Sequence, residues 1–297
     1  MSKSVDIWCI GSVLWDIVGR ADANYGSVRD VPGRIRRIPG GVAMNIAMTL
    51  LRFDLTPGLL SAVGQDPDGD ELVRAAKAMK MHTEYLLRDA HLPTDIYMAI
   101  EDPRGLVAAL ADAHSLEAAG DRILAPLEDG RLGSAKTPYE GRLALDGNLT
   151  EHLLEEIATR ASFGRADLRV APASPGKCTR LRPLLAHPNT TFYVNLEEAR
   201  LILEGDFQDA AMAAAALVTA GAARAFVTDG PQAASFADRA QRFTARPPSV
   251  TCLRVTGAGD TCMAAHIAAE ARGLGPEAAL IAAQTAAARY VAGEDAN

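Results

Sequence analysis

Apolar and polar positions follow two alternating patterns along most of the chain. Short apolar runs predict buried strands over residues 6–10, 58–63, 142–145, 168–171, 191–194 and 225–228. Apolar residues spaced three or four apart predict helices over residues 43–52, 69–79, 150–162, 196–203, 209–220, 259–272 and 276–292. Strands that alternate with helices are typical of a parallel sheet covered by helices. The pattern therefore predicts an α/β fold with a central, mainly parallel sheet flanked by helices.

Two segments depart from this alternation. Residues 94–100 and 106–110 are strand-like and flank the turn Asp102-Pro103-Arg104-Gly105, which predicts a hairpin. Residues 13–38 are rich in Gly, Asp and Arg and lack helical periodicity. We expect the two segments to form a small β layer outside the main sheet. No internal repeat or low-complexity linker divides the chain, so we expect one domain over residues 1–297.

Composition and charge narrow the class of partner. The chain of 297 residues is 48% hydrophobic and 23% charged, which is a globular composition. Its net charge of −7 argues against a nucleic-acid coat or a membrane-surface binder. The longest apolar run, residues 210–218, is about half as long as a membrane span. A small anionic ligand remains compatible, because a nest of backbone amides can hold phosphate locally. We therefore expect a small-molecule partner, and neither nucleic acid nor a membrane.

The N-terminus and the cysteines point to a reducing compartment. Residues 7–15 have the apolarity of a signal-peptide core, but only Lys3 supplies positive charge and Asp6 adjoins the run. A first buried strand that turns at Gly11 explains the run better, and we expect an unprocessed cytoplasmic protein. The four cysteines are too few and too scattered for a disulfide scaffold or a Cys-x-x-Cys metal site. We expect buried or partly buried thiols at Cys9, Cys178, Cys252 and Cys262.

The strongest local signal is the sequence Val255-Thr256-Gly257-Ala258-Gly259-Asp260-Thr261 before a long apolar helix. Small residues at a helix N-terminus leave backbone N–H groups unobstructed, and such groups bind anions. A carboxylate there repels a phosphate, but it can take a proton from a hydroxyl that attacks phosphorus. Asp260 is therefore a candidate base, while helix capping explains the same residue equally well. The segment matches neither a Walker A loop nor a dinucleotide fingerprint.

A second glycine motif, Pro39-Gly40-Gly41-Val42-Ala43-Met44-Asn45, opens the helix predicted over residues 43–52. The paired glycines allow a ligand to approach the backbone, and Asn45 lies one turn into the helix. Its amide can donate and accept together, which suits the vicinal hydroxyls of a sugar. A glycine turn followed by a locally satisfied asparagine is the alternative, and taken alone it explains the motif better.

In this order and at about this spacing, the two glycine motifs resemble those of the ribokinase-type (PfkB) family of carbohydrate and nucleoside kinases. The resemblance covers most of the chain and continues through residues 59–66 (LLSAVGQD), 195–199 (NLEEA) and 227–230 (VTDG). It implies a ribokinase-like fold, with a small β lid that closes over the sugar and often makes the dimer contact. The lid corresponds to approximately residues 13–38 and 94–111, and the resemblance implies a homodimer through it.

The resemblance also assigns roles by position. The catalytic base of the family corresponds to Asp260, and its anion hole to Gly257, Ala258 and Gly259. The pocket that grips the sugar hydroxyls corresponds to Asp16, Gly40, Gly41 and Asn45.

The resemblance assigns the nucleotide-binding and metal-binding positions in the same way. Asn195 and Glu198 match a motif that orders Mg²⁺ and its waters, although solvated polarity at a helix start explains them too. Thr228 and Gly230 match the segment that runs along ATP, where Ala233 replaces the usual second glycine. Lys177 falls where the family often places a basic residue near the ATP phosphates, and a solvated loop lysine is the other interpretation.

Within the family, the chain is most similar to the pseudouridine kinase branch. The similarity lies in residues 32–35, 39–47, 146–148 and 174–178. It implies that Asp112 and Asn148 lie near the base of a nucleoside. Ala171 and the pair Ala113-His114 depart from that branch.

The resemblance thus implies an enzyme that uses ATP and Mg²⁺ to phosphorylate the 5′-hydroxyl of a ribosyl substrate, with pseudouridine as the favoured substrate. Ribokinase or another sugar or nucleoside kinase is the alternative within the family. A catalytically silent sugar-binding paralogue is the alternative from a different class. The joint presence of Asp260, Asp16 and Asn45 disfavours it, because a silent protein has no reason to keep them.

Overall fold

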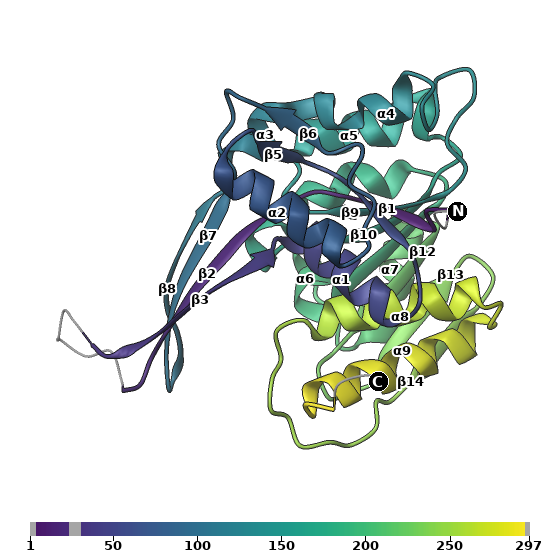
Figure 1. Ribbon diagram of the computed structural model, residues 1–297. Helices are drawn as coiled ribbons and strands as arrows, with labels where there is room; N and C mark the ends of the chain where they lie inside the picture. Colours follow the sequence, from purple (N-terminus) through teal and green to yellow (C-terminus); the bar gives the residue numbers. More distant parts are fainter. Residues whose placement is uncertain (1–3, 24–30, 295–297) are drawn as a thin grey trace.

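The main sheet has eight strands in the order β14-β13-β12-β11-β10-β9-β1-β4 (Figure 1). The computed structural model describes residues 4–23 and 31–294. The strands are β1 (Ile7–Ile10), β4 (Pro57–Leu60), β9 (Arg142–Asp146), β10 (Asp167–Ala171), β11 (Thr190–Asn195), β12 (Arg224–Thr228), β13 (Ala234–Asp238) and β14 (Arg242–Ala245). Neighbours from β4 to β12 pair in parallel, and β13 and β14 are antiparallel additions at one edge. The predicted mainly parallel sheet is confirmed.

Helices cover both faces of this sheet, and each predicted helix has a counterpart. One face carries α1 (Val42–Arg52), α2 (Pro67–Ala78), α8 (Ala258–Ala271) and α9 (Pro276–Val291). The other carries α3 (His114–Ala119), α4 (Ala125–Glu128), α5 (Glu151–Thr159), α6 (Leu196–Leu203), α7 (Ala210–Thr219) and the 3₁₀ segment η3 (Pro175–Ala186). Along β1, Trp8 and Ile10 belong to one core cluster while Ile7 and Cys9 belong to the other. This alternation explains why the strands are continuously apolar: both faces are buried.

Some local predictions were wrong. The run over residues 58–63 is two elements, β4 and β5 (Ala62–Gly64), and β5 pairs with β6 (Leu87–Asp89) in a separate two-stranded sheet. The break falls at Ser61, whose hydroxyl donates to the Gly11 carbonyl at 2.5 Å. The helix predicted over residues 150–162 ends at Thr159, because Arg160 has an extended backbone and a 3₁₀ turn, η2 (Ala161–Phe163), follows. Cys252 is exposed, since it lies on a solvent-facing loop, while Cys9, Cys178 and Cys262 are buried.

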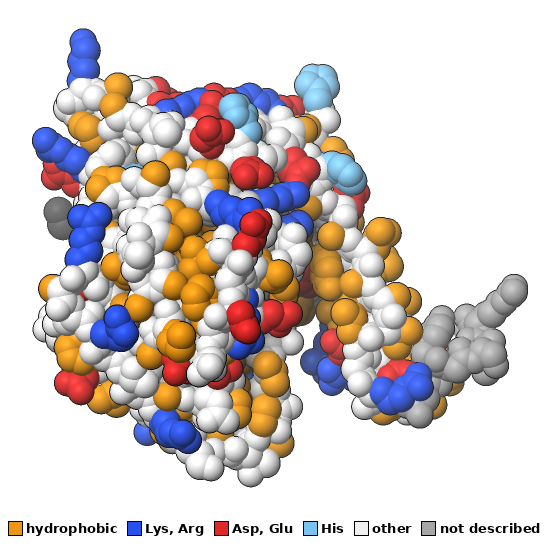
Figure 2. All heavy atoms as spheres, turned by 180° about the vertical axis from the view of Figure 1, so that it is seen from behind, with side chains coloured by type: hydrophobic (Ala, Val, Ile, Leu, Met, Phe, Trp, Pro, Cys, Tyr) orange, Lys and Arg blue, Asp and Glu red, His pale blue; other side chains and the backbone are white. Residues whose placement is uncertain are grey.

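A second sheet of four strands, in the order β3-β2-β7-β8, projects from the body of the molecule (Figure 1). Its strands are β2 (Leu14–Ala21), β3 (Gly33–Gly40), β7 (Ile96–Asp102) and β8 (Gly105–Asp112). These come from the two segments expected to form a β layer, and residues 24–30 of the expected lid lie outside the described residues. Apolar side chains gather on the projection (Figure 2), and those that are exposed are Ile35, Ile38, Met98, Leu106, Val107 and Leu110.

The root of this second sheet is attached to α2. The Arg37 guanidinium lies 3.8 Å above the Trp15 ring and forms ion pairs with Asp68 and Glu71. The Trp15 indole N–H donates to the Asp68 carbonyl at 2.9 Å. Polar and aromatic contacts thus anchor the base of the sheet, while its outer part has little protein around it.

Candidate active site

The candidate residues cluster where parallel strands end. Asn195 ends β11 and lies beside Thr228, the last residue of β12. Asp146 ends β9 and lies beside Ala171, the last residue of β10. In open α/β sheets the crevice outside the carboxyl ends of the strands is the usual ligand site. This edge of the main sheet is therefore where the chemistry of the fold is expected.

The start of α8 forms an open nest. Gly257 has φ +88°, and a Cβ on Gly259 would meet no atom within 4 Å. The Ala258 N–H donates to the Val255 carbonyl at 3.1 Å, and the first helical bond runs from the Thr261 N–H to the Gly257 carbonyl at 3.0 Å. The N–H groups of Gly259 and Asp260 belong to the first turn, which has no acceptors inside the helix. They and the positive end of the helix dipole can therefore face an anion.

Asp260 is a half-buried carboxyl with an unusual proton affinity. Burial, assisted by the negative charge of Asp146, raises the pKa of Asp260 to about 7. The N-cap of α8 is Gly257, and no side chain caps this helix within the described residues, so capping does not explain the carboxyl. A carboxylate of this basicity can accept a proton from an alcohol in the transition state at neutral pH.

Asp146 joins three parts of the site, and it was not among the residues selected from the sequence. Its carboxylate accepts from the backbone N–H groups of Ser12 at 2.8 Å, Ala43 at 3.0 Å and Asn148 at 2.7 Å. A side chain at Gly11 would overlap this carboxylate, which accounts for the glycine. Two signals were available in the sequence: the Asp-x-Asn spacing and a glycine directly after the first strand. Neither shows that Asp146 bonds to Ser12, which lies 134 residues earlier in the chain.

The glycine pair before α1 packs closely against polar groups. A Cβ at Gly41, whose φ is +90°, would lie 2.5 Å from the Ser12 carbonyl oxygen, and one at Gly40 would overlap the Asp16 carboxylate. The Val42 N–H donates to the Ser12 hydroxyl at 2.7 Å, and the Met44 N–H donates to the Ser12 carbonyl at 3.3 Å. The first turn of α1 therefore has its partners inside the protein, unlike the first turn of α8.

Asp16 and Asn45 both lie next to this glycine pair: a Cβ on Gly40 would overlap the Asp16 carboxylate, and the Asn45 N–H donates to the Gly41 carbonyl at 2.8 Å. Asp16 is in β2, opposite Ile38 of β3 and Tyr97 of β7. Burial raises the pKa of Asp16 to about 6. Asn45 is half-buried one turn into α1. The structure thus brings Asp16, Gly40 and Gly41 together at the root of the second sheet.

Asn148 and Lys177, assigned to different ligands, contact each other. The Asn148 amide donates to the Ser12 hydroxyl at 2.9 Å and accepts from the Lys177 ammonium at 2.8 Å. Both ends of the amide are thus occupied. The pair forms a polar chain from the buried Asp146 carboxylate, through Ser12, to a lysine at the rim.

Asn195 and Glu198 form a complete capping box at the start of α6. The Asn195 amide oxygen accepts from the Glu198 N–H, and the Glu198 carboxylate accepts from the Asn195 N–H, both at 2.8 Å. This geometry supports the interpretation of Asn195 and Glu198 as polar residues that cap the start of a helix. Glu198 is nevertheless only 8% exposed, and burial raises the pKa of its carboxyl. Among the described residues, no cluster of three or more His, Cys, Asp or Glu side chains forms a metal cage.

The remaining assigned residues lie at the margins. Gly230 follows Thr228 with φ +52° and open space where a Cβ would be. Asp112 ends β8 on the second sheet, and its carboxylate accepts a hydrogen bond from Nδ1 of the His114 ring at 2.8 Å. This carboxylate raises the pKa of His114. The described contacts do not join Asp112 to the other candidate residues.

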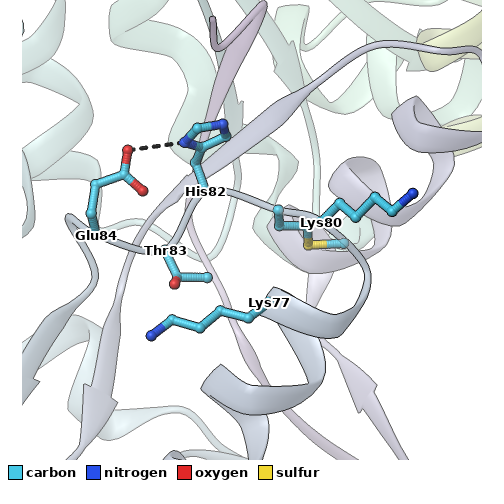
Figure 3. Close-up of a pocket in the computed structure, with 6 residues that line it drawn as sticks. Lys77, Lys80, His82, Thr83 and Glu84 are labelled. Atoms are coloured by element: carbon cyan, nitrogen blue, oxygen red, sulfur yellow. Dashed lines mark hydrogen bonds and ion pairs between the residues drawn. The ribbon is translucent and has the colours of Figure 1, made fainter. Parts of the chain in front are cut away.

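Two shallow pockets, both open to solvent, lie away from this edge. One of about 270 Å³ is lined by Lys77, Lys80, Met81, His82, Thr83 and Glu84 (Figure 3). There the His82 ring is bonded to the Glu84 carboxylate at 3.1 Å. A second cavity of about 480 Å³ lies around residues 130–140 and Arg165. Neither of these two pockets is lined by a candidate residue.

Comparison with known proteins places this geometry in a family. The sequence profile of the pfkB family carbohydrate kinases matches residues 5–296. The chain is 28% identical over 260 residues to a pseudouridine kinase of Escherichia coli (strain K12), covering 86% of this chain and 80% of that protein. It is 27% identical over 177 residues to a pseudouridine kinase of Arabidopsis thaliana, covering 58% of this chain and 44% of that protein.

Solved structures of sugar kinases have the same fold. A carbohydrate kinase from Agrobacterium tumefaciens superposes with a TM-score of 0.81 at 25% identity, covering 96% of this chain and 90% of that one. A ribokinase from Thermotoga maritima gives a TM-score of 0.78 at 20% identity, with 97% and 93% covered. A putative ribokinase II from E. coli, solved with ATP and Mg²⁺, superposes with a TM-score of 0.77 at 18% identity. The match covers 97% of this chain and 93% of that one.

The fold and the family match define a sugar or nucleoside kinase, a phosphotransferase that acts on a hydroxyl group. The chain belongs to the pfkB family of carbohydrate kinases and has its ribokinase-like fold, as the sequence motifs imply. Kinases of this family use ATP. No described helix has the length and apolarity needed to cross a membrane.

Proposed function

We propose that this kinase transfers the γ-phosphoryl group of ATP to the 5′-hydroxyl of a ribosyl substrate, with pseudouridine as that substrate. The observation that carries the reaction is Asp260, a carboxyl with a pKa of about 7 in the first turn of α8, beside open backbone N–H groups. A base and an anion site so close together match the needs of phosphoryl transfer to an alcohol.

In the proposed reaction, the Asp260 carboxylate takes the proton of the attacking hydroxyl. The alcohol oxygen forms a bond to the γ-phosphorus, the bond from that phosphorus to the bridging oxygen breaks, and ADP leaves with the electron pair. The N–H groups of Gly259 and Asp260 face the transferred group and stabilise charge on its oxygens. Asp16 and Asn45 hold the sugar hydroxyls, with Gly40 and Gly41 giving the backbone close access.

Glu198 suits a magnesium ion that keeps most of its waters. One of its oxygens accepts from the Asn195 N–H, and burial makes the uncompensated carboxylate charge costly, so a nearby cation relieves that cost. The lack of a carboxylate cage among the described residues fits Mg²⁺, which is usually held by one or two carboxylates plus phosphates and water. When bound, the ion neutralises charge on the phosphate oxygens. Asn195, Thr228, Gly230 and Lys177 are assigned to the nucleotide.

The choice of pseudouridine rests on two pseudouridine kinases among the relatives, at 28% and 27% identity. Pseudouridine has a ring N–H that uridine lacks, so an acceptor opposite it discriminates between them. Asp112 and Asn148 are the proposed acceptors. The Asn148 oxygen accepts one hydrogen bond from Lys177, and its second lone pair can accept from the base. A ribokinase, or another sugar or nucleoside kinase, is the alternative.

We also propose that the second sheet is the lid and that a homodimer forms through it. Ile35 is 79% exposed and Leu110 is 72% exposed on this sheet, and apolar surface of this kind is usually covered by a partner. The cytoplasmic location expected from the sequence stays a prediction.

A side-by-side assay of pseudouridine, uridine and ribose with saturating Mg·ATP tests the substrate. We expect kcat/KM for pseudouridine to exceed the other two by at least about tenfold, or ~1.4 kcal/mol. Equal or better turnover of ribose would make the protein a general sugar kinase and leave the reaction unchanged. Absence of turnover with every sugar and nucleoside would support a silent paralogue.

A further inference from the structure

The last turn of α9 holds the loop that leads into the nest of α8. The N–H groups of Leu253 and Arg254 both donate to the Val291 carbonyl, at 2.8 and 3.2 Å. The Arg254 Nε–H donates to the Tyr290 carbonyl at 2.9 Å. A guanidinium at the C-terminal carbonyls of a helix is favoured by the helix dipole. These hydrogen bonds join the loop to the helix end.

The side chain of Tyr290 continues this contact up to the nest. Its hydroxyl donates to the Thr256 carbonyl at 3.0 Å. A Cβ on Gly257 would lie 2.5 Å from the same hydroxyl oxygen, so the tyrosine lies directly against the glycine turn. The Arg254 guanidinium covers the ring, 3.9 Å from its centroid. The Tyr290 side chain thus contacts both Thr256, which precedes the nest, and Gly257, which begins it.

The loop itself is exposed to solvent. Leu253 and Val255 are 73% and 72% exposed, and residues 251–256 all face solvent. The orientation of the Thr256–Gly257 peptide sets the direction in which the first turn of α8 points. The hydrogen bonds to α9 help to set that orientation.

We propose that Tyr290 is a positioning residue for phosphoryl transfer, which fixes the nest and Asp260 through the Thr256 carbonyl, with Arg254 holding the ring. This inference rests on the proposed function, since it gives the nest a part in the reaction. Misplacement of groups that act on the transition state lowers kcat. The groups proposed to bind the acceptor sugar lie elsewhere, so the KM for the acceptor should not change.

Tyr290→Phe removes only the hydroxyl and keeps the ring under Arg254. We expect kcat to fall about tenfold or more, KM for the acceptor to stay within about twofold, and Tm to change little. Tyr85→Phe is the matched control, because Tyr85 is also half-buried beneath a guanidinium, that of Arg131 at 5.3 Å. We expect wild-type kinetics from it.

A double-mutant cycle tests the support by Arg254. Arg254→Met alone should lower kcat in the same manner, and the double variant should lose less than the product of the two single losses. Independent multiplicative losses would overturn the claim that the two side chains act as one unit.

Amide hydrogen exchange gives a readout that does not require activity. Exchange over residues 253–260 should be about five- to tenfold faster in Tyr290→Phe than in the wild type, and unchanged in Tyr85→Phe. Unchanged exchange, or a wild-type kcat in Tyr290→Phe, would overturn the positioning role. Faster exchange in Tyr290→Phe, together with a wild type that phosphorylates no sugar or nucleoside, would uphold the contact with the nest and refute the proposed function.

Discussion

A carboxyl in the first turn of a helix normally ionises easily, because the helix dipole and the free N–H groups favour its charge. Asp260 departs from this rule, since burial and the charge of Asp146 raise its pKa to about 7. A nearly neutral pKa is costly for the folded protein but suits a general base, which works best when its pKa is near the operating pH. The departure favours the proposed catalytic role of Asp260 over a capping role.

The pH profile tests this assignment. The base must be ionised, so kcat/KM for the acceptor should fall about tenfold per pH unit below pH about 7. Below pH about 6 the fall should steepen, because Asp16 then protonates and no longer accepts from two hydroxyls. Initial rates between pH 5 and 9 at low acceptor concentration provide the measurement. A flat profile from pH 8 to pH 5 would contradict both roles.

At the scale of elements, three helix N-termini carry similar sequence signals and have different uses. The first turn of α1 is occupied by Ser12 and Asp146, and that of α6 by its capping box. The turn of α8, where Gly259 lies, is open. Glycine and polar residues at a helix start predict the helix reliably, but whether its N–H groups are free depends on residues distant in the chain. The sequence predicts unobstructed N–H groups at α8, but the partners that occupy the first turn of α1 could not be predicted from it.

Glu198→Gln separates the two roles of that residue. Glutamine also completes a capping box, so helix α6 and Tm should be little affected. The loss of charge should raise the Mg²⁺ concentration needed for half-maximal activity, and EDTA should abolish wild-type activity. Glu197→Gln, on the exposed neighbour, is the control. An unchanged Mg²⁺ requirement in Glu198→Gln, or full activity in EDTA, would remove Glu198 from the proposed metal site.

Most of the main sheet could be predicted because its strands are apolar on both faces and are separated by amphipathic helices. The antiparallel strands β13 and β14 were missed. Along β14 the side chains alternate between exposed and half-buried, so no apolar run marks it. The contacts of Asp146 were missed for another reason: hydrogen bonds across more than a hundred residues leave no periodic signal.

At the scale of the molecule, the second sheet combines a fixed root with a free outer part. Arg37 and Trp15 fix the root to α2, while β8 is exposed along its whole length. Exposed apolar strands are prone to pairing, and proteins usually cover them. The proposed covering is the same sheet of a second copy, which gives a closed twofold contact.

A charged substitution on the second sheet tests the proposed homodimer. Leu110→Glu should convert a dimer into a monomer, because an unpaired carboxylate in an apolar interface is costly. Sedimentation or light scattering measures the mass. Met212→Glu, on a similarly apolar exposed position of α7, should leave the dimer intact. A wild type that is already monomeric at micromolar concentration would refute the proposed homodimer.

The central claim is that Asp260 is the base, and the clearest variant is Asp260→Asn. This change should not weaken the fold. A carboxyl whose folded-state pKa lies above its unfolded value favours the protonated folded state, so its ionisation costs stability as pH rises from about 4 to about 7. The asparagine variant lacks that cost. Its Tm should therefore equal or exceed the wild-type value at pH 8, which excludes unfolding as a cause of lost activity.

The most direct measurement is kcat of Asp260→Asn at saturating Mg·ATP and acceptor, alongside its dissociation constants for both substrates. We predict a fall in kcat of about 10²–10⁴ with binding retained, since the amide keeps the shape but cannot take the proton. A variant with nearly full kcat would contradict the account, because the proton would then leave the hydroxyl without this carboxylate.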